Sequence, residues 1–227
     1  MTADQGLRKP AAVPPRPYRT WSWKVAGVAA IVAGVIWFLG FTLPLFIPRF
    51  VDPTVSAVRV LHGTFGIIAM VTAVLQILPG VRRRFPLFHR WNGRVYVFLG
   101  VLPSAVLLVG VLFDMHDVGE TALFFWGMVW IGTTAVAWVA ARRRQYLKHR
   151  QWMTYSVAIT LVAATNAGIV ELMPVLTHVF SADVIANSLT WLPWVLHLAV
   201  AHWFIRRTTS VPYPRRKPRE AEATQSA

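Results

Sequence analysis

Six runs of about 20 apolar residues divide this chain, and each is long enough to cross a lipid bilayer. An α-helix rises about 1.5 Å per residue, so about 20 residues span the roughly 30 Å of hydrocarbon in a membrane. Composition agrees, because a chain that is 56% hydrophobic and 14% charged is too apolar for an ordinary soluble domain. The predicted spans are residues 25–47, 57–79, 92–113, 121–141, 152–173 and 184–205.

These runs predict an all-α, polytopic integral membrane protein with six transmembrane helices. Helices satisfy their own backbone hydrogen bonds inside lipid, which an irregular chain does not. The connections are short, so we expect one membrane domain over residues 23–206. A basic, proline-rich tail at residues 1–22 and a polar tail at residues 207–227 are predicted to be disordered and cytoplasmic.

Basic residues are concentrated on one side of the predicted membrane domain. Of the 23 lysines and arginines, 21 fall in or beside the two tails, in residues 80–94 or in residues 142–150, and the two exceptions are Arg49 and Arg59. Loops rich in Lys and Arg stay on the cytoplasmic side of a membrane, so both termini are predicted to be cytoplasmic. Basic segments beside a bilayer bind anionic headgroups. The net charge of +14 therefore indicates a lipid partner and not nucleic acid.

The pattern Arg-Arg-Arg-x-x-Leu-x-His-Arg occurs twice, at Arg82–Arg90 and Arg142–Arg150. Each copy lies between two apolar runs, so it predicts a basic turn between two membrane helices. A Trp and then a Tyr follow each copy at slightly different offsets. We therefore predict a duplicated helical hairpin, in which helices 2–3 correspond to helices 4–5. Parallel repeats occur in transporters, with substrate between the halves, but the stable packing of duplicated hairpins explains the pattern more simply.

Motifs of soluble enzymes are missing from the sequence. The chain has no cysteine, which excludes disulfides, thiolate metal sites and a cysteine nucleophile. It also lacks a glycine-rich phosphate loop, a nucleophile elbow and a His-Glu-x-x-His zinc motif. These absences favour a non-enzymatic role.

Histidines beside the two basic turns form the first candidate site. His89 and His149 stand at the inner entrances of helices three and five. Imidazole is a common ligand of haem, copper and iron, and the adjacent Arg90 and Arg150 are suited to haem propionates or lipid phosphates. Helix six carries two further histidines, His197 and His202. They are about 140° apart around the helix and do not serve one site together.

Polar residues near the outer ends of helices two, five and six form the second candidate site. Arg59 and His62 are three residues apart and share a helix face. Lone charges at membrane depth are costly, so we expect Arg59 to pair with Glu171. If the three helices meet, Asn166 and Asn187 complete a polar pocket that opens to the outside. The alternative is that Arg59 extends to the interface and His62 is a hydrogen-bonded structural residue.

Several motifs resemble a known bacterial family, the predicted membrane proteins called domain of unknown function 2306. The similarity covers roughly residues 58–175 and leaves helices one and six outside. It implies a polytopic bacterial membrane protein without an established activity, whose family histidines correspond to His62, His89 and His149. This chain differs from the family pattern at two places. Family members often have arginine at the position of Thr154 or Tyr155 and again near the position of Asn166. The motifs are Leu61-His62-Gly63, Pro79 with the basic turn after it, His89-Arg90-Trp91-Asn92-Gly93-Arg94-Val95-Tyr96 and His149-Arg150-Gln151-Trp152-Met153.

Three functions remain open from the sequence. The leading interpretation is a non-enzymatic accessory or small-ligand-binding protein of the bacterial cytoplasmic membrane, and an accessory role would involve a membrane-protein partner. The second is a redox or metal-handling protein in which His62, His89 and His149 hold haem, iron or copper. The third is a small-solute transporter with a path through the outer polar residues. Neither the ligand nor the oligomeric state follows from the sequence.

Overall fold

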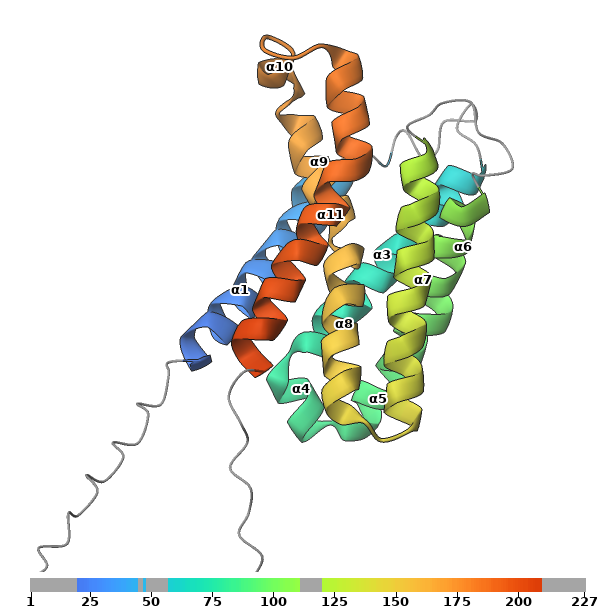
Figure 1. Cartoon of the computed structure of the whole chain (residues 1–227), viewed down its shortest axis with the longest axis vertical. Coiled ribbons are helices and arrows are strands. Elements are labelled where there is room, and N and C mark those ends of the chain that lie inside the picture. The colour runs from blue at the N-terminus through green and yellow to red at the C-terminus, as the bar shows by residue number, and fades with distance from the viewer. Residues whose placement is uncertain (1–19, 45–46, 48–56, 111–119, 210–227) are drawn as a thin grey trace, which may run out of the picture.

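The computed structural model describes residues 20–44, 47, 57–110 and 120–209, and the predicted tails lie largely outside these residues (Figure 1). The described chain is helical nearly throughout and contains no β-strand. Two of its elements, η1 and η2, are short π-helices. The elements are α1 (Thr20–Trp37), η1 (Phe38–Thr42), α3 (Ala57–Ile77), α4 (Pro79–Arg84), α5 (Pro86–Arg94), η2 (Val95–Val101), α6 (Leu102–Gly110), α7 (Glu120–Arg142), α8 (Tyr146–Thr160), α9 (Val162–Glu171), α10 (Met173–Leu176) and α11 (Ala182–Thr209).

Six stretches of the described chain are long and apolar enough to cross a membrane. This confirms the predicted all-α fold class with six membrane-spanning helices. The third span joins α5, η2 and α6, and the fifth joins α8 and α9. The spans are Val25–Thr42, Ala57–Ile77, Pro86–Gly110, Thr121–Arg142, Tyr146–Glu171 and Ala182–Thr208.

The third and fifth spans begin about two turns earlier than the sequence predicted. They start at Pro86 and Tyr146, whereas the apolar runs indicated positions 92 and 152. Arginine and leucine are good helix formers, and proline is well suited to the first helical position because its missing N–H is not needed there. The basic segments are therefore mostly helical. Only Phe85 separates α4 from α5, and residues 143–145 alone join α7 to α8.

The turn between α7 and α8 has the hydrogen bonds of a Schellman motif. The Gln145 N–H donates to the Ala140 carbonyl at 2.9 Å, and the Arg144 N–H donates to the Ala141 carbonyl at 3.0 Å. Arg144 has φ 58°, in the left-handed region where glycine is usual. An arginine in this conformation carries a strain cost that a glycine would avoid.

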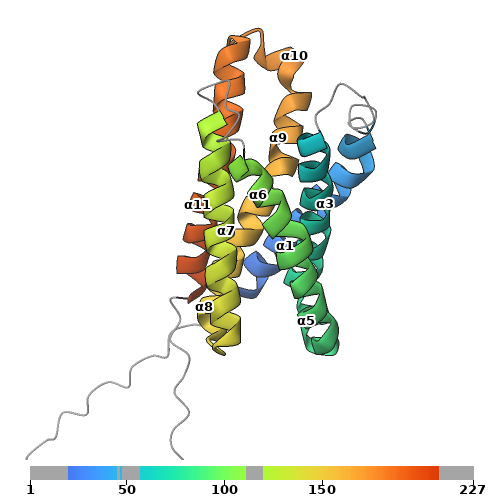
Figure 2. The ribbon, with the colours of Figure 1, turned by 90° about the vertical axis from the view of Figure 1, so that its right-hand side faces the viewer.

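The described helices form two adjacent hairpins. In the first, α3 packs along η2 and α6, and in the second, α7 packs along α8. The hairpins contact each other where α6 meets α7 and where α3 meets α8 (Figures 1 and 2). α11 packs on α8 and α9, while α1 contacts α3 and η1 contacts α9. That the two hairpins are copies of one ancestral unit stays a prediction.

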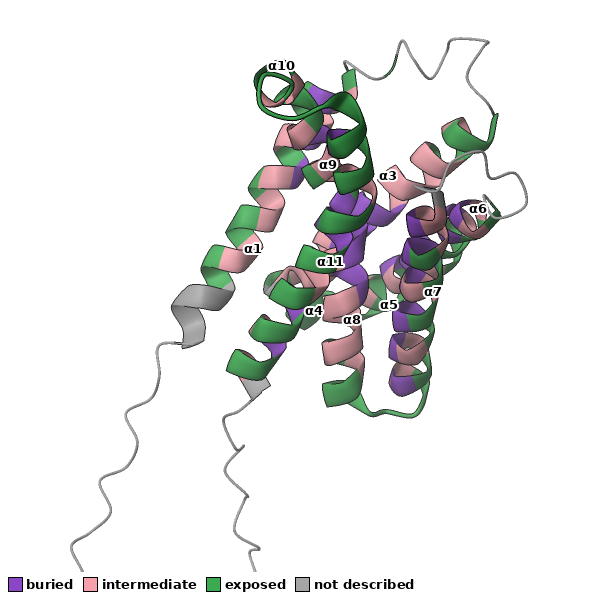
Figure 3. Cartoon of the chain, turned by 45° about the horizontal axis from the view of Figure 1, so that its top comes forward, coloured by how far each residue is buried: buried purple, intermediate pink, exposed green. Residues whose placement is uncertain are grey.

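Small residues allow the helices of the first hairpin to approach closely. A Cβ atom at Gly100 of η2 would lie 2.7 Å from the Cα atom of Ala69 on α3. Between the hairpins, a Cβ atom at Gly127 of α7 would lie 2.8 Å from the Ala105 carbonyl oxygen on α6. Close contact through small residues is the usual basis of helix association in membranes. The buried residues accordingly gather where α3, α7 and α8 face one another (Figure 3).

A cluster of buried hydroxyl groups lies within this core. The Tyr96 Oη atom is 2.7 Å from Ser156 Oγ and 2.9 Å from Thr160 Oγ1. Ser156 Oγ is also 2.6 Å from Thr134 Oγ1. All four side chains are buried, so these bonds join η2, α7 and α8 where water does not compete with them.

Candidate functional site

His62 is held by a neighbouring helix of its own hairpin. Its Nδ1 atom lies 3.0 Å from both the carbonyl oxygen and the Oγ atom of Ser104 on α6. The Ser104 hydroxyl donates its hydrogen to the His62 carbonyl at 3.1 Å, and the Ser104 carbonyl can only accept. The hydrogen of the neutral ring is therefore assigned to Nδ1, which leaves Nε2 with a free lone pair.

His149 is held in the same way in the second hairpin. Its Nδ1 atom lies 2.9 Å from the carbonyl oxygen of Ala137 on α7, which again assigns the ring hydrogen to Nδ1. His149 is the fourth residue of α8, near the end of the bundle that carries the basic turns. His62 lies near the opposite end of α3, so the two rings are separated along the bundle.

The Nε2 atoms of His62 and His149 have no hydrogen-bond partner among the described residues. His197 on α11 gives the contrast. Its Nδ1 atom lies 2.6 Å from the Ala158 carbonyl, and its Nε2 atom lies 2.9 Å from Thr165 Oγ1. Both nitrogens of His197 are thus used in joining α11 to α8 and α9 across the break at residue 161, which makes His197 a structural residue.

His89 is placed like His149 but is not anchored in the same way. It is the fourth residue of α5, and its carbonyl accepts a hydrogen bond of 2.7 Å from Gln76 Nε2. Its Nδ1 atom is buried and has no partner in the part of the chain that the structure describes. His149 and Arg82 lie within electrostatic range of the ring. The two histidines that the repeat predicted therefore lie at the same end of the bundle and within electrostatic range of each other, while Arg90 and Arg150, which follow them in the chain, are exposed.

The donor set does not form a conventional metal-ion site. Among the described residues, no group of three or more His, Asp or Glu side chains is close enough to hold one ion. Ions such as Zn²⁺ usually take three or four protein ligands.

The outer polar residues do not meet as the sequence suggested. Glu171 Oε1 accepts a 2.8 Å hydrogen bond from Thr42 Oγ1 on η1, and no ion pair joins Glu171 to the exposed Arg59 within the described chain. Asn166 lies on α9 with a buried Oδ1 atom that has no partner among the described residues. The role of Thr42 as the partner of Glu171 was not predicted from the sequence. Nothing in a continuous apolar run indicates that its helix becomes π-helical near the end.

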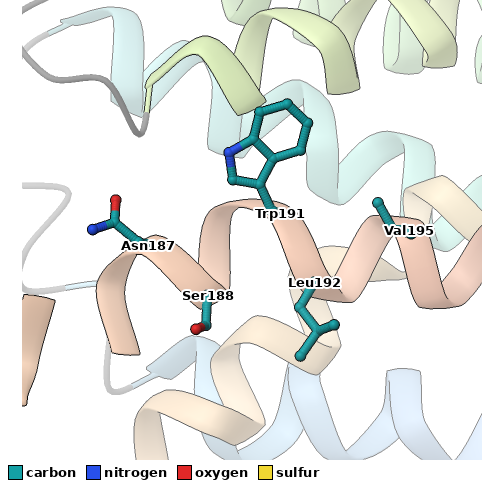
Figure 4. A pocket seen from close by; sticks show the side chains of 5 residues that line it. All are labelled: Asn187, Ser188, Trp191, Leu192 and Val195. Carbon is teal, nitrogen blue, oxygen red and sulfur yellow. The ribbon is translucent and has the colours of Figure 1, made fainter. Parts of the chain in front are cut away.

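Asn187 lies apart from this group, on an open groove along α11. The groove is predominantly apolar, and Asn187 and Ser188 form its polar end (Figure 4). The Trp191 ring extends toward α7, where its centroid is 6.1 Å from that of Phe125. Within the described residues, no hydrogen bond joins Asn187 to Arg59, Asn166 or Glu171.

Comparison with known proteins assigns the family. No curated protein and no solved structure gives a significant match to the chain. A family model described as "Predicted membrane protein (DUF2306)" matches residues 59–205, from α3 through almost all of α11. The match thus includes the sixth helix, which the resemblance in the sequence had left outside. Because the model covers more than half of the chain, this protein belongs to the DUF2306 family of predicted membrane proteins.

Proposed function

We propose that this chain is a non-enzymatic protein of the bacterial cytoplasmic membrane that binds small ligands at two separate sites, one at His62 and one at His149. One observation carries the proposal: each ring is held through Nδ1 by a backbone carbonyl of the neighbouring helix, while Nε2 has no hydrogen-bond partner among the described residues. Histidines that ligate metals are usually oriented in this way, because the second hydrogen bond fixes the tautomer and the ring plane. His197, whose nitrogens are both bonded, shows how a purely structural histidine differs in the same fold.

Haem is the ligand class that best fits these donors. A porphyrin supplies its own equatorial nitrogens, so the protein has to contribute only axial ligands, and histidine is the commonest of these. This requirement agrees with isolated imidazoles and with the lack of a three-donor cluster among the described residues. A bound haem would supply electron-transfer chemistry. The transport alternative has no comparable support, since no described contact links its polar residues into a path.

Haem titration of purified variants tests the proposal. We expect detergent-purified protein to develop a Soret band on addition of haemin. His62→Ala and His149→Ala should each weaken haem binding at the substituted site at least about tenfold, as expected when a ligand-site interaction of about 1.4 kcal/mol is removed. His178→Ala is the control, because His178 is exposed in the turn before α11. His197→Ala should lower stability but leave haem binding intact. Equal haem affinity in all five proteins would contradict the proposal.

We further propose that the basic turns face the cytoplasm, in accordance with the positive-inside rule. A reporter that is active only in the periplasm should work when fused after residue 117, which lies outside the described residues. The same reporter fused after residue 146, beside the second basic turn, should be silent. The reverse pair of results would contradict this orientation.

A further inference from the structure

The two basic turns place ten cationic side chains at one end of the bundle. All ten are exposed, and no described acidic residue lies near them. The described acids, Glu120, Glu171 and Asp183, occur where α7, α9 and α11 begin or end on the opposite side. The charges of the turns are therefore not neutralised within the described fold. The ten residues are Arg82, Arg83, Arg84, Arg90, Arg94, Arg142, Arg143, Arg144, Lys148 and Arg150.

The fold brings the two turns to the same end of the bundle and to a similar depth. His89 and His149 each occupy the fourth position of a helix and lie within electrostatic range of each other. Seven residues after each histidine, Tyr96 Oη and Ser156 Oγ are 2.7 Å apart. Because both helices run in the same direction from the basic end, this contact places the two arginine-rich turns at the same end of the bundle. Their cations therefore face the same leaflet of the membrane.

Exposed apolar side chains surround these cations. The guanidinium of Arg94 lies 4.5 Å from the centre of the Trp91 ring, and that of Arg84 lies 5.9 Å from the centre of the Phe85 ring. Aromatic residues mixed with arginine are typical of the layer where headgroups meet hydrocarbon. A soluble anion would leave these apolar side chains in water. The exposed apolar residues beside the turns are Phe85, Leu87, Phe88, Trp91, Tyr146 and Leu147.

We propose that the two basic turns together bind the phosphate headgroups of anionic phospholipids in the adjacent leaflet. Arginine binds phosphate through paired, charge-assisted hydrogen bonds, while the aromatic and leucine side chains contact the upper part of the acyl chains. The site is independent of the ligand at His62, whereas His149 lies within the second basic turn, between Lys148 and Arg150.

Thermal unfolding of the purified full chain in detergent tests the proposal. Adding phosphatidylglycerol should raise the unfolding temperature by about 4 °C more than the same amount of phosphatidylcholine, and high salt should reduce this difference. In the variant R83Q/R84Q/R142Q/R143Q the difference should fall below about 1 °C. The control R215Q/R216Q/K217Q/R219Q removes the same charge from the C-terminal segment and should keep the full difference.

Three results would overturn the proposal. They are equal stabilisation by the two lipids, an unchanged difference in the turn variant, and full stabilisation by inorganic phosphate alone, which would identify a soluble anion as the ligand. If the fourfold variant does not fold, the milder R83Q/R143Q variant is compared with R216Q/R219Q by native mass spectrometry. Loss of co-purified anionic lipid from R83Q/R143Q alone supports the proposal, and equal retention in both contradicts it.

Discussion

Replacing Tyr96 with phenylalanine isolates the contribution of the buried hydroxyl cluster. The Tyr96 hydroxyl bonds Ser156 Oγ and Thr160 Oγ1, so Tyr96→Phe removes two hydrogen bonds and leaves the ring in place. No orphaned group results, because Ser156 keeps Thr134 and Thr160 still donates to the Ser156 carbonyl at 2.9 Å. Hydrogen bonds between membrane helices contribute about 0.6 kcal/mol on average and up to about 2 kcal/mol. We therefore expect Tyr96→Phe to cost about 1–2 kcal/mol.

This loss should appear as a fall of about 3–6 °C in the unfolding temperature of the detergent-purified protein. Tyr155→Phe is the matched control. Tyr155 Oη also makes a short side-chain bond, 2.8 Å to His202 Nδ1, but the pair is exposed one turn from Arg206, at the end of α11 where interfacial water can replace it. Its removal should therefore cost less than about 0.5 kcal/mol. In a double-mutant cycle, Tyr96→Phe and Ser156→Ala should couple by about 1 kcal/mol. Equal melting of the two tyrosine variants, or a coupling near zero, would refute the assignment of the cluster as an interhelical lock.

The other predictions concern backbone positions and the histidine that joins α11 to the fifth span. Gly100→Ala should cost about 1–3 kcal/mol of stability because the new Cβ atom meets the Ala69 backbone. The control Gly132→Ala has open space around the new Cβ atom and should stabilise the protein by about 0.5–1 kcal/mol. Similar shifts of the unfolding temperature in the two variants would contradict the close packing at Gly100. Arg144→Gly should raise stability by about 1 kcal/mol by relieving its left-handed conformation, and a lower unfolding temperature would show that this backbone is not strained. His197→Ala should cost about 1–2 kcal/mol through the loss of both nitrogen contacts, and unchanged melting would remove its structural role.

The number of spans could be predicted from the sequence because the signal is local. A run of about 20 apolar residues is sufficient to indicate a membrane helix wherever the other helices lie. The starts of the third and fifth spans were wrong because charged residues were interpreted as loops. In the structure, α5 begins at Pro86 and α8 at Tyr146, and the helices continue through both His-Arg pairs. Helix propensity and proline at the first position therefore outweigh polarity as boundary signals there.

The candidate site was predictable in its residues but not in its contacts. The repeat indicated that His89 and His149 lie at equivalent positions, and in the structure each is the fourth residue of its helix and within electrostatic range of the other. The acceptors that orient His62 and His149 are backbone carbonyls, and a carbonyl carries no residue-type signal. The serine at 104 offers one clue, since a small polar residue within an apolar run often bonds another helix. The sequence predicted a cation as the partner of Glu171 because it did not show that Thr42 of η1 supplies a hydroxyl group there.

The most direct test of the central claim is an absorption spectrum of the native protein. Protein purified in detergent from haem-replete cells would be measured oxidised and then reduced, with elemental analysis of the same sample. If the imidazoles of His62 and His149 bind haem, the spectrum will show a Soret band that shifts on reduction, together with stoichiometric iron. A colourless protein free of iron and copper would contradict the account and leave His62 and His149 as helix-joining residues.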